Sequence, residues 1–587
     1  MVRFRLWAPN AEMVELDRAG NRQPMIADMS GWWILEDPDA GPGAEYTFRL
    51  DGGDPLPDPR SACQPRGIHG PSRVVDHNTF AWNDTGFTQC PLASAIVYEL
   101  HIGTFTPAGT FDNAIQRLDH LIDLGVTHVQ LMPVATFGGN RGWGYDGVDL
   151  YAPHEAYGGP EGLRRFVDAC HVRGVAVLLD VVYNHLGPAG NHLEHFGPYF
   201  TDRYRTPWGK AVNLDDAGSA EVRRFLIDNA LMWLRDYHVD GLRLDAVHAI
   251  FDQSAVHFLE QLALEVSSLE SHLGRRLILI AESDLNDPRL VRSREAGGYG
   301  LDAQWSDDFH HAMHALLAGE RAGYYADFGS MEHLDRSLHH VFVYAGHESE
   351  FRQRRHGRPA VGLPGTRFLG YLQNHDQVGN RARGDRSSHL MTEGRLRIGA
   401  ALVLTAPFVP MLFQGEEWAA TSPFQYFADH EDPELARAVR VGRREEFAAF
   451  GWNPEDVPDP QDEQTFRRSK LDWSEHTQEP HAGMLEWHRR LIAYRRKMPE
   501  LTDGRMDRVQ TRMDQRAGSF LMRRGRVALA FNIGKETQRV ELPEGTAALA
   551  LASAASVCLF ERAVELPPDT VAVLEIAQPT RRVADGA

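Results

Sequence analysis

The chain has 587 residues, of which 43 % are hydrophobic and 24 % charged, and its 61 basic and 81 acidic residues give a formal net charge of -20. This length exceeds that of one ordinary domain, and the composition is typical of globular proteins with large apolar cores. The acidic balance disfavours nucleic acids and anionic membrane surfaces as partners, because both attract basic patches. An uncharged substrate such as a sugar is compatible with it.

The cysteine pattern favours a reducing compartment. No two of the four cysteines form a CxxC pair, so a zinc cage is not indicated; they are Cys63, Cys90, Cys170 and Cys558. The first residues lack the apolar core of a signal peptide. The most apolar segment, 399–414, is interrupted by Pro407 and Pro410, which predicts a helix, a turn and a strand rather than a membrane span. We therefore expect a cytoplasmic protein.

Residues 1–90 are expected to form an N-terminal β-sandwich. Short runs such as 2–7 and 46–50 alternate apolar and polar residues, and clusters of Gly, Pro and Asp separate them. This alternation is typical of small antiparallel sheets that bury one face. A proline-rich stretch, 54–59, lies inside this region.

Residues 91–502 are expected to form a (β/α)₈ barrel, the TIM-barrel class of α/β fold. Strand-like runs occur at 96–100, 126–132, 175–181, 239–244, 277–281, 301–304, 368–373 and 411–413. Amphipathic helical segments between them include 113–124, 162–172, 220–237, 255–272, 332–344 and 393–405. Eight alternating units predict a closed barrel. A doubly wound open sheet is the alternative, but no glycine-rich phosphate loop follows the first strand.

The end of the chain is expected to return to β-structure. The segment 417–482 is rich in Pro, Asp and aromatic residues and is predicted to be a long loop on the catalytic face, before a last barrel helix at 483–496. Short alternating runs after residue 503 predict a C-terminal β-domain over 503–587. The last ten residues are expected to be frayed.

Three of the predicted strands end in a carboxylate: Asp245, Glu282 and Asp376. A single acid at this position is most often a cap for the next helix. Three together indicate a catalytic cluster, because an unpaired buried charge is costly and catalytic residues of barrels lie at the carboxyl ends of strands. Glycoside hydrolysis needs such a cluster, in which one carboxyl group attacks the sugar and another protonates the leaving oxygen.

Four segments, 180–185, 241–248, 279–283 and 368–376, resemble the signature regions of the α-amylase clan of glycoside hydrolases in content and order. The resemblance implies that Asp245 is the nucleophile, Glu282 the general acid/base and Asp376 the transition-state stabiliser. It also implies retention of configuration through a covalent glycosyl-enzyme, with two carboxyl groups about 5–5.5 Å apart. Glu282 must be protonated to act as an acid, so its surroundings should raise its pKa.

The same resemblance assigns substrate-binding residues around this cluster. Arg243 would lie beside the nucleophile and keep it ionised. His185 and His375 would form hydrogen bonds with hydroxyls of the sugar that is cleaved, and Tyr145 would stack on the ring of that sugar. Without the neighbouring motifs, Tyr145 would be interpreted as an aromatic residue of the core. In many amylases the residue matching Asn184 binds calcium, but the segment that would carry the other ligands is short here. We expect no essential metal and no cofactor.

Longer stretches, 142–159, 343–358, 371–385, 411–420 and 467–473, are similar to the maltooligosyltrehalose trehalohydrolases. These enzymes hydrolyse the α-1,4 bond that joins a maltooligosaccharide to a terminal trehalose. Unlike ordinary amylases, which commonly carry Lys-His there, the chain has His248 and Ala249 after the nucleophile. On the leaving-group side the resemblance implies binding by Trp208, His248, Ala249, Tyr324, Phe351 and Arg352. A glucan branching enzyme and a non-catalytic glucan-binding protein are the alternatives; the second requires a broken triad.

Overall fold

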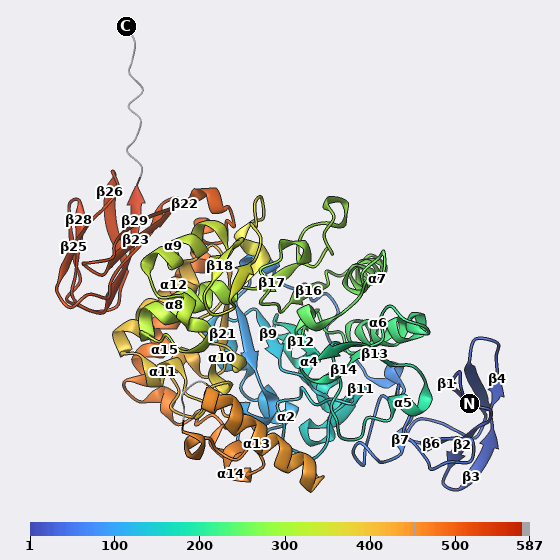
Figure 1. The fold of residues 1–587 in the computed structure, drawn as a ribbon. Helices are drawn as coiled ribbons and strands as arrows, with labels where there is room; N and C mark the ends of the chain where they lie inside the picture. Colours follow the sequence, from blue (N-terminus) through green and yellow to red (C-terminus); the bar gives the residue numbers. More distant parts are fainter. Residues whose placement is uncertain (450–452, 578–587) are drawn as a thin grey trace.

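A closed barrel of eight parallel strands forms the centre of the computed structural model, which describes residues 1–449 and 453–577 (Figure 1). Around the barrel the strands follow the order of the chain and each overlaps a predicted one, so the predicted barrel is confirmed. They are β8 (Val97–Leu100), β9 (His128–Leu131), β12 (Ala176–Val181), β15 (Gly241–Leu244), β16 (Ile278–Ala281), β17 (Ala303–Trp305), β20 (Phe368–Gly370) and β21 (Val409–Phe413).

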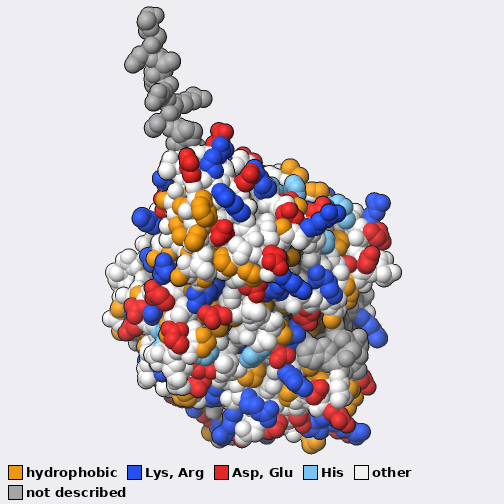
Figure 2. All heavy atoms as spheres, turned by 90° about the vertical axis from the view of Figure 1, so that its left-hand side faces the viewer, with side chains coloured by type: hydrophobic (Ala, Val, Ile, Leu, Met, Phe, Trp, Pro, Cys, Tyr) orange, Lys and Arg blue, Asp and Glu red, His pale blue; other side chains and the backbone are white. Residues whose placement is uncertain are grey.

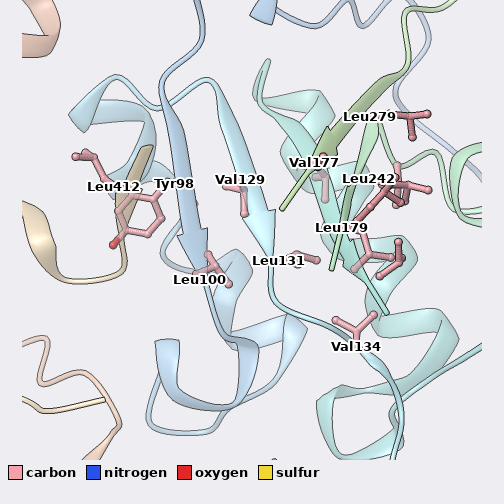
Figure 3. Close-up of a cluster of buried hydrophobic side chains, with 14 of the residues drawn as sticks. Tyr98, Leu100, Val129, Leu131, Val134, Val177, Leu179, Leu242, Leu279 and Leu412 are labelled. Carbon is pink, nitrogen blue, oxygen red and sulfur yellow. The ribbon is translucent and has the colours of Figure 1, made fainter. Parts of the chain in front are cut away.

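Side chains of the barrel strands point alternately into the barrel and toward the helices around it. Leu178 and Ile280 belong to the cluster inside the barrel. Their neighbours Leu179 and Leu279 belong to the larger cluster between the barrel and its helices, with Leu242 of β15 (Figure 3). Both faces of the strands are therefore buried, which explains why the strands were recognisable as continuous apolar runs.

Helices cover the outside of the barrel, mostly where predicted: α4 (Gly159–Val172), α6 (Ser219–Asp236), α7 (Phe258–Leu273), α9 (Met331–His340), α12 (Glu393–Thr405) and α15 (His481–Lys497). The predicted helix 113–124 is instead two short helices, α2 (Phe111–Ile115) and α3 (Leu118–Leu124). α8 (Asp307–Ala318) was not predicted. It carries an apolar stripe at helical spacing, which made it recognisable, and it also buries Asp308, His310 and His314; the apolar residues are Phe309, Ala312, Met313, Leu316 and Leu317.

The prediction of a long loop over 417–482 was wrong in part, because the segment contains α13 (Pro433–Ala449) and α14 (Glu463–Arg468). α13 begins with a proline in its first turn, which favours helix initiation, and continues with Ala, Leu, Arg and Glu, which are strong helix formers. The proline content that suggested a loop therefore includes a residue that starts a helix.

The N-terminal residues form two antiparallel sheets, as predicted. One has the order β1-β5-β4 and the other β3-β2-β6-β7. The sheets meet where Phe4 of β1 packs on Tyr46 of β6, with ring centroids 4.7 Å apart. Arg60 attaches this region to the barrel through an ion pair of 2.8 Å with Asp228 of α6. The strands are β1 (Val2–Trp7), β2 (Val14–Arg18), β3 (Asn21–Pro24), β4 (Ile26–Ala27), β5 (Trp32–Asp37), β6 (Glu45–Leu50) and β7 (Ser72–Arg73).

The C-terminal residues form a second pair of sheets, in the orders β22-β23-β24-β29-β26 and β25-β28-β27, which share an apolar cluster. Buried Arg524 fastens them to the barrel by donating hydrogen bonds of 2.7 Å to the carbonyls of Thr405 and Ala406 at the end of α12. The strands are β22 (Val509–Asp514), β23 (Ser519–Arg524), β24 (Val527–Asn532), β25 (Gln538–Glu541), β26 (Thr546–Ala552), β27 (Cys558–Phe560), β28 (Ala563–Leu566) and β29 (Thr570–Ala577). The end predicted to be frayed, 578–587, lies outside the described residues.

Acidic and basic side chains are interspersed on the face shown in Figure 2, where neither sign forms one continuous area. The apolar segment 399–414 forms the end of α12, a turn and β21, as predicted. Within the described ranges, no helix has the length and apolar content needed to cross a membrane.

Candidate active site

The predicted carboxylates lie at the carboxyl end of the barrel because strand alternation places them there. Glu282 follows Ile280 by two residues, and Asp180 follows Leu178 by two, so both acids share the inward orientation of these apolar side chains. Asp245 follows β15 directly, before Ala246, whose φ of 38° turns the backbone at the strand end. Asp376 lies in the short helix α10 (His375–Gly379), after β20.

Arg243 is the centre of the cluster. Its side chain is fully buried, and its Nη1 donates to Asp245 Oδ1 at 2.8 Å and to both carboxylate oxygens of Asp180 at 2.7 and 2.9 Å. Its Nη2 lies 3.4 Å from Glu282 Oε2. One guanidinium group therefore contacts three carboxyl groups, and its positive charge favours the ionised form of its neighbours. On the side of the barrel interior, the Trp305 ring packs against the Arg243 guanidinium group, whose carbon lies 4.2 Å from the ring centroid.

The second carboxylate oxygen of Asp245 has a partner of its own. Asn184 donates from its amide nitrogen to Asp245 Oδ2 at 2.8 Å and to the Asp245 carbonyl at 2.9 Å. Asp245 is thus oriented by Arg243 on one oxygen and by Asn184 on the other. The amide that the resemblance associates with calcium is directed at the carboxylate here. In the described part of the chain, no cluster of three or more His, Cys, Asp or Glu side chains has the arrangement of a metal site.

Glu282 has the environment expected of a general acid. Burial raises its pKa to about 7, and the charges of Asp245 and Asp376 act in the same direction, while Arg243 opposes them. The backbone N–H of Ala246 donates to Glu282 Oε2. The expected upward shift is therefore present, and close to neutral pH the group exchanges a proton readily.

Glu99 of β8 holds His375 in position through both of its carboxylate oxygens. The carboxylate of Glu99 accepts from the backbone N–H of His375 at 2.9 Å, and its other oxygen lies 2.7 Å from Nδ1. Nε2 lies 2.7 Å from the Tyr145 hydroxyl and 3.4 Å from Asp376 Oδ2. Burial alone would lower the pKa of His375, but Asp376 and Glu99 raise it to about 9. The imidazole is therefore a cation at neutral pH.

A cavity of about 660 Å³, called the main cavity below, opens over this cluster. Its lining contains ten of the residues predicted to act: Tyr145, His185, Trp208, Asp245, His248, Glu282, Tyr324, Phe351, Arg352 and Asp376. Arg243 and His375 lie directly behind the lining. Ala249 is buried and is not part of the lining.

Two aromatic side chains in the lining of the main cavity are exposed to solvent. Trp208 is 48 % exposed and stacks on His185 with ring centroids 4.6 Å apart, and Phe351 is 45 % exposed. Arg352, also in the lining, has its guanidinium carbon 6.0 Å from the Phe351 ring centroid and its Nη2 3.5 Å from Asp284 Oδ2. Of two adjacent tyrosines, Tyr324 lines the cavity. Such aromatic faces cover the apolar C–H faces of sugar rings.

Residues 73–204 match the family model of the alpha amylase catalytic domain. A malto-oligosyltrehalose trehalohydrolase from Arthrobacter ramosus is 54 % identical over 91 % of this chain and 93 % of its own length. One from Mycobacterium tuberculosis is 50 % identical over 99 % of this chain and all of its own. The crystal structure of a putative alpha amylase from Salmonella typhimurium has a TM-score of 0.90 and 40 % identity, covering 98 % of this chain and 97 % of that one.

The chain belongs to the malto-oligosyltrehalose trehalohydrolase family. It is therefore a glycoside hydrolase with the alpha-amylase fold. The full-length similarity includes the N-terminal and C-terminal sheets as well as the barrel.

The structure adds residues to this trehalohydrolase site that the sequence analysis did not assign. Asp180, to which no role was assigned from the sequence, pairs with Arg243 and accepts a hydrogen bond of 2.7 Å from Tyr145. Glu99 was recognisable as an acid inside the predicted strand 96–100, by the same reasoning that identified Asp245. Other lining residues come from α8 and α13, whose positions were not predicted; they are Asp307, His311, Val439, Gly442 and Arg443.

Proposed function

We propose that the protein hydrolyses the α-1,4-glucosidic bond next to the terminal trehalose of maltooligosyltrehalose and releases trehalose. The observation that carries the proposal is the combination of a carboxylate cluster around Arg243 with exposed aromatic side chains in the lining of the main cavity, in a chain with full-length trehalohydrolase relatives. The partners are then uncharged α-glucans. Domain boundaries at residues 90 and 502 are part of the proposal.

The reaction uses two carboxyl groups in turn. Glu282 donates its proton to the glycosidic oxygen while Asp245 Oδ attacks the anomeric carbon, so the bond to trehalose breaks and a glycosyl ester forms. Glu282, now ionised, takes a proton from water, whose oxygen displaces Asp245 and restores the starting state. Asp376 faces the same cavity and would bind sugar hydroxyls as positive charge develops on the ring. Every step uses side chains of this chain.

Substrate preference is the first test. We expect the protein to release trehalose from maltooligosyltrehalose much faster than it cuts maltooligosaccharides of equal length, because Trp208, Phe351 and Arg352 in the cavity lining would contact the leaving trehalose. Product analysis on maltopentaose and on its trehalose-terminated analogue measures both rates. Equal rates on the two substrates would contradict the proposal and favour an ordinary amylase.

Specificity should be separable from chemistry. Trp208→Ala and Phe351→Ala remove exposed aromatic surface but no carboxylate, and losing such a contact costs roughly 1–3 kcal/mol. We expect kcat/KM for the trehalose-terminated substrate to fall about ten- to a hundred-fold, with little change for plain maltooligosaccharides. Steady-state kinetics on both substrates provide the measurement. A proportional loss on both would place the trehalose pocket elsewhere.

Activity should decline on the alkaline side of neutrality. Glu282 acts in its protonated form, and its pKa is raised to about 7, so the active fraction is large below this pH and decreases above it. The rate then falls about ten-fold per pH unit. The profile of kcat/KM against pH should show this descending limb. A constant kcat/KM up to pH values well above 7 would show that Glu282 is not the general acid.

The alternatives make different predictions. A branching enzyme would transfer the glycosyl group to another glucan, so longer or branched products would replace free trehalose in the same assay. A non-catalytic glucan-binding protein would have lost a carboxylate, whereas Asp245, Glu282 and Asp376 all line the cavity. A cytoplasmic location completes the proposal, supported by four cysteines that are all free thiols.

A further inference from the structure

A second cavity, of about 310 Å³, lies next to the main cavity and takes no part in the proposed mechanism. His248 lines both cavities. Glu282 faces the main cavity, while Ser283, the next residue, lines the second. The volume is at the lower end of the range of roughly 300–1,000 Å³ that is usual for small-molecule sites.

Two pairs of stacked rings contribute to the lining of the second cavity. Tyr204 stacks on Phe251 with centroids 5.3 Å apart and planes inclined by 16°. His257 stacks on Tyr299 at 4.4 Å and 16°. Phe251 is 36 % exposed and Leu285 is 39 % exposed. Apolar ring faces of this kind, accessible at the edge of a polar site, suit the C–H faces of sugars.

Each acidic side chain of the lining is paired with an arginine. Asp252 is paired with Arg223. Asp287 is paired with Arg289 at 2.6 Å. Burial lowers the pKa of His257, so this imidazole is neutral at pH 7. An ionic ligand would find no uncompensated countercharge in these pairs, which favours an uncharged ligand that accepts and donates hydrogen bonds.

One β-hairpin contributes residues to the lining of both cavities. Its strands are β13 (Phe200–Thr206) and β14 (Gly209–Val212). Trp208, in the turn, lines the main cavity on the side assigned to the leaving group, and Tyr204, on β13, lines the second. A sugar that moves away from the leaving-group side therefore meets a second set of aromatic rings, one of which, Tyr204, belongs to the same hairpin.

We propose that the second cavity is an accessory binding site for a neutral disaccharide, the trehalose that leaves the main cavity. The identity of this ligand rests on the proposed function. Trehalose bound in this site lies next to the active centre and slows the departure of the next trehalose from the main cavity. Its binding therefore causes product inhibition from outside the main cavity.

Equilibrium dialysis of the intact protein with labelled trehalose tests the proposal. We expect two binding sites per chain in the unmodified protein. Phe251→Ala removes a ring face, and Leu285→Trp fills the cavity from an exposed position; each should weaken one site about ten-fold and leave the other intact. Initial rates without added trehalose should not change. Phe560→Ala, which truncates a 42 % exposed ring in the C-terminal sheets, is the matched control and should keep both sites.

Crystals soaked in trehalose should show the sugar between Phe251 and Tyr299. The proposal is overturned if the unmodified protein has a single site, or if both Phe251→Ala and Leu285→Trp retain two. Binding needs no turnover, so this result is independent of the test of function. A protein that fails to release trehalose from maltooligosyltrehalose yet loses one site in Phe251→Ala would refute the proposed function alone.

Discussion

Replacing Asp245 with asparagine is expected to lower kcat by roughly 10⁴-fold or more, the scale observed when an enzyme loses its nucleophile. The amide has almost the same shape, and Arg243 keeps its two contacts with Asp180, so the fold should be retained. What is lost is the anionic oxygen that forms the glycosyl ester. Steady-state rates on maltooligosyltrehalose give the size of the loss, and circular dichroism checks the fold.

Two further measurements make the assignment of the nucleophile specific. Asp146→Asn is a suitable control, because Asp146 lines the same cavity but lies 3.9 Å from His430 rather than against Arg243. It should retain most of the activity. A fluorinated glycosyl fluoride that is hydrolysed slowly should label the unmodified protein, and peptide mass spectrometry should locate the sugar on Asp245. Label on any other residue would refute the assignment.

The catalytic carboxylates were predictable because the sequence places acidic residues at the ends of strands that must be buried. Asp245 and Glu282 each follow a run of apolar residues that only a buried strand explains, and a buried strand end tolerates an acid only if other groups compensate it. The positions of most barrel strands followed from similar apolar runs, although the run 301–304 contains Asp302 and Gln304. The structure adds the compensation itself: Arg243, which the sequence placed beside Asp245 alone, also contacts Asp180 and Glu282.

The walls of the cavity were harder to predict because their positions depend on tertiary packing. α13 supplies Gly442 and Arg443, yet its segment was predicted to be a loop. α8 supplies Asp307 and His311. Its apolar residues recur at helical spacing, so the helix itself was recognisable, but its packing against the cavity was not. The direction of a side chain in a short segment is equally invisible to periodicity: Tyr324 faces the cavity, whereas the hydroxyl of its neighbour Tyr325 lies 2.9 Å from His310 Nε2.

Glu282→Gln is expected to lower kcat on maltooligosyltrehalose about 10²- to 10⁴-fold, the usual contribution of a general acid. Glutamine cannot protonate the leaving trehalose, although it preserves the size of the side chain. The alkaline limb that begins near the raised pKa of Glu282, about 7, should disappear from the residual activity. A pH profile therefore distinguishes loss of the acid from a distorted site, because distortion would lower the rate but keep the limb.

The same variant should separate the two chemical steps. With a maltosyl fluoride the leaving group needs little acid help, so Glu282→Gln should still transfer the sugar to Asp245. Water then attacks slowly, because no base activates it, and the glycosyl-enzyme should accumulate in a form that intact-protein mass spectrometry detects. Added azide needs no base and should restore turnover by forming a glycosyl azide of retained configuration. Failure of azide to restore turnover, with no accumulated intermediate, would show that Glu282 is not the acid/base of this site.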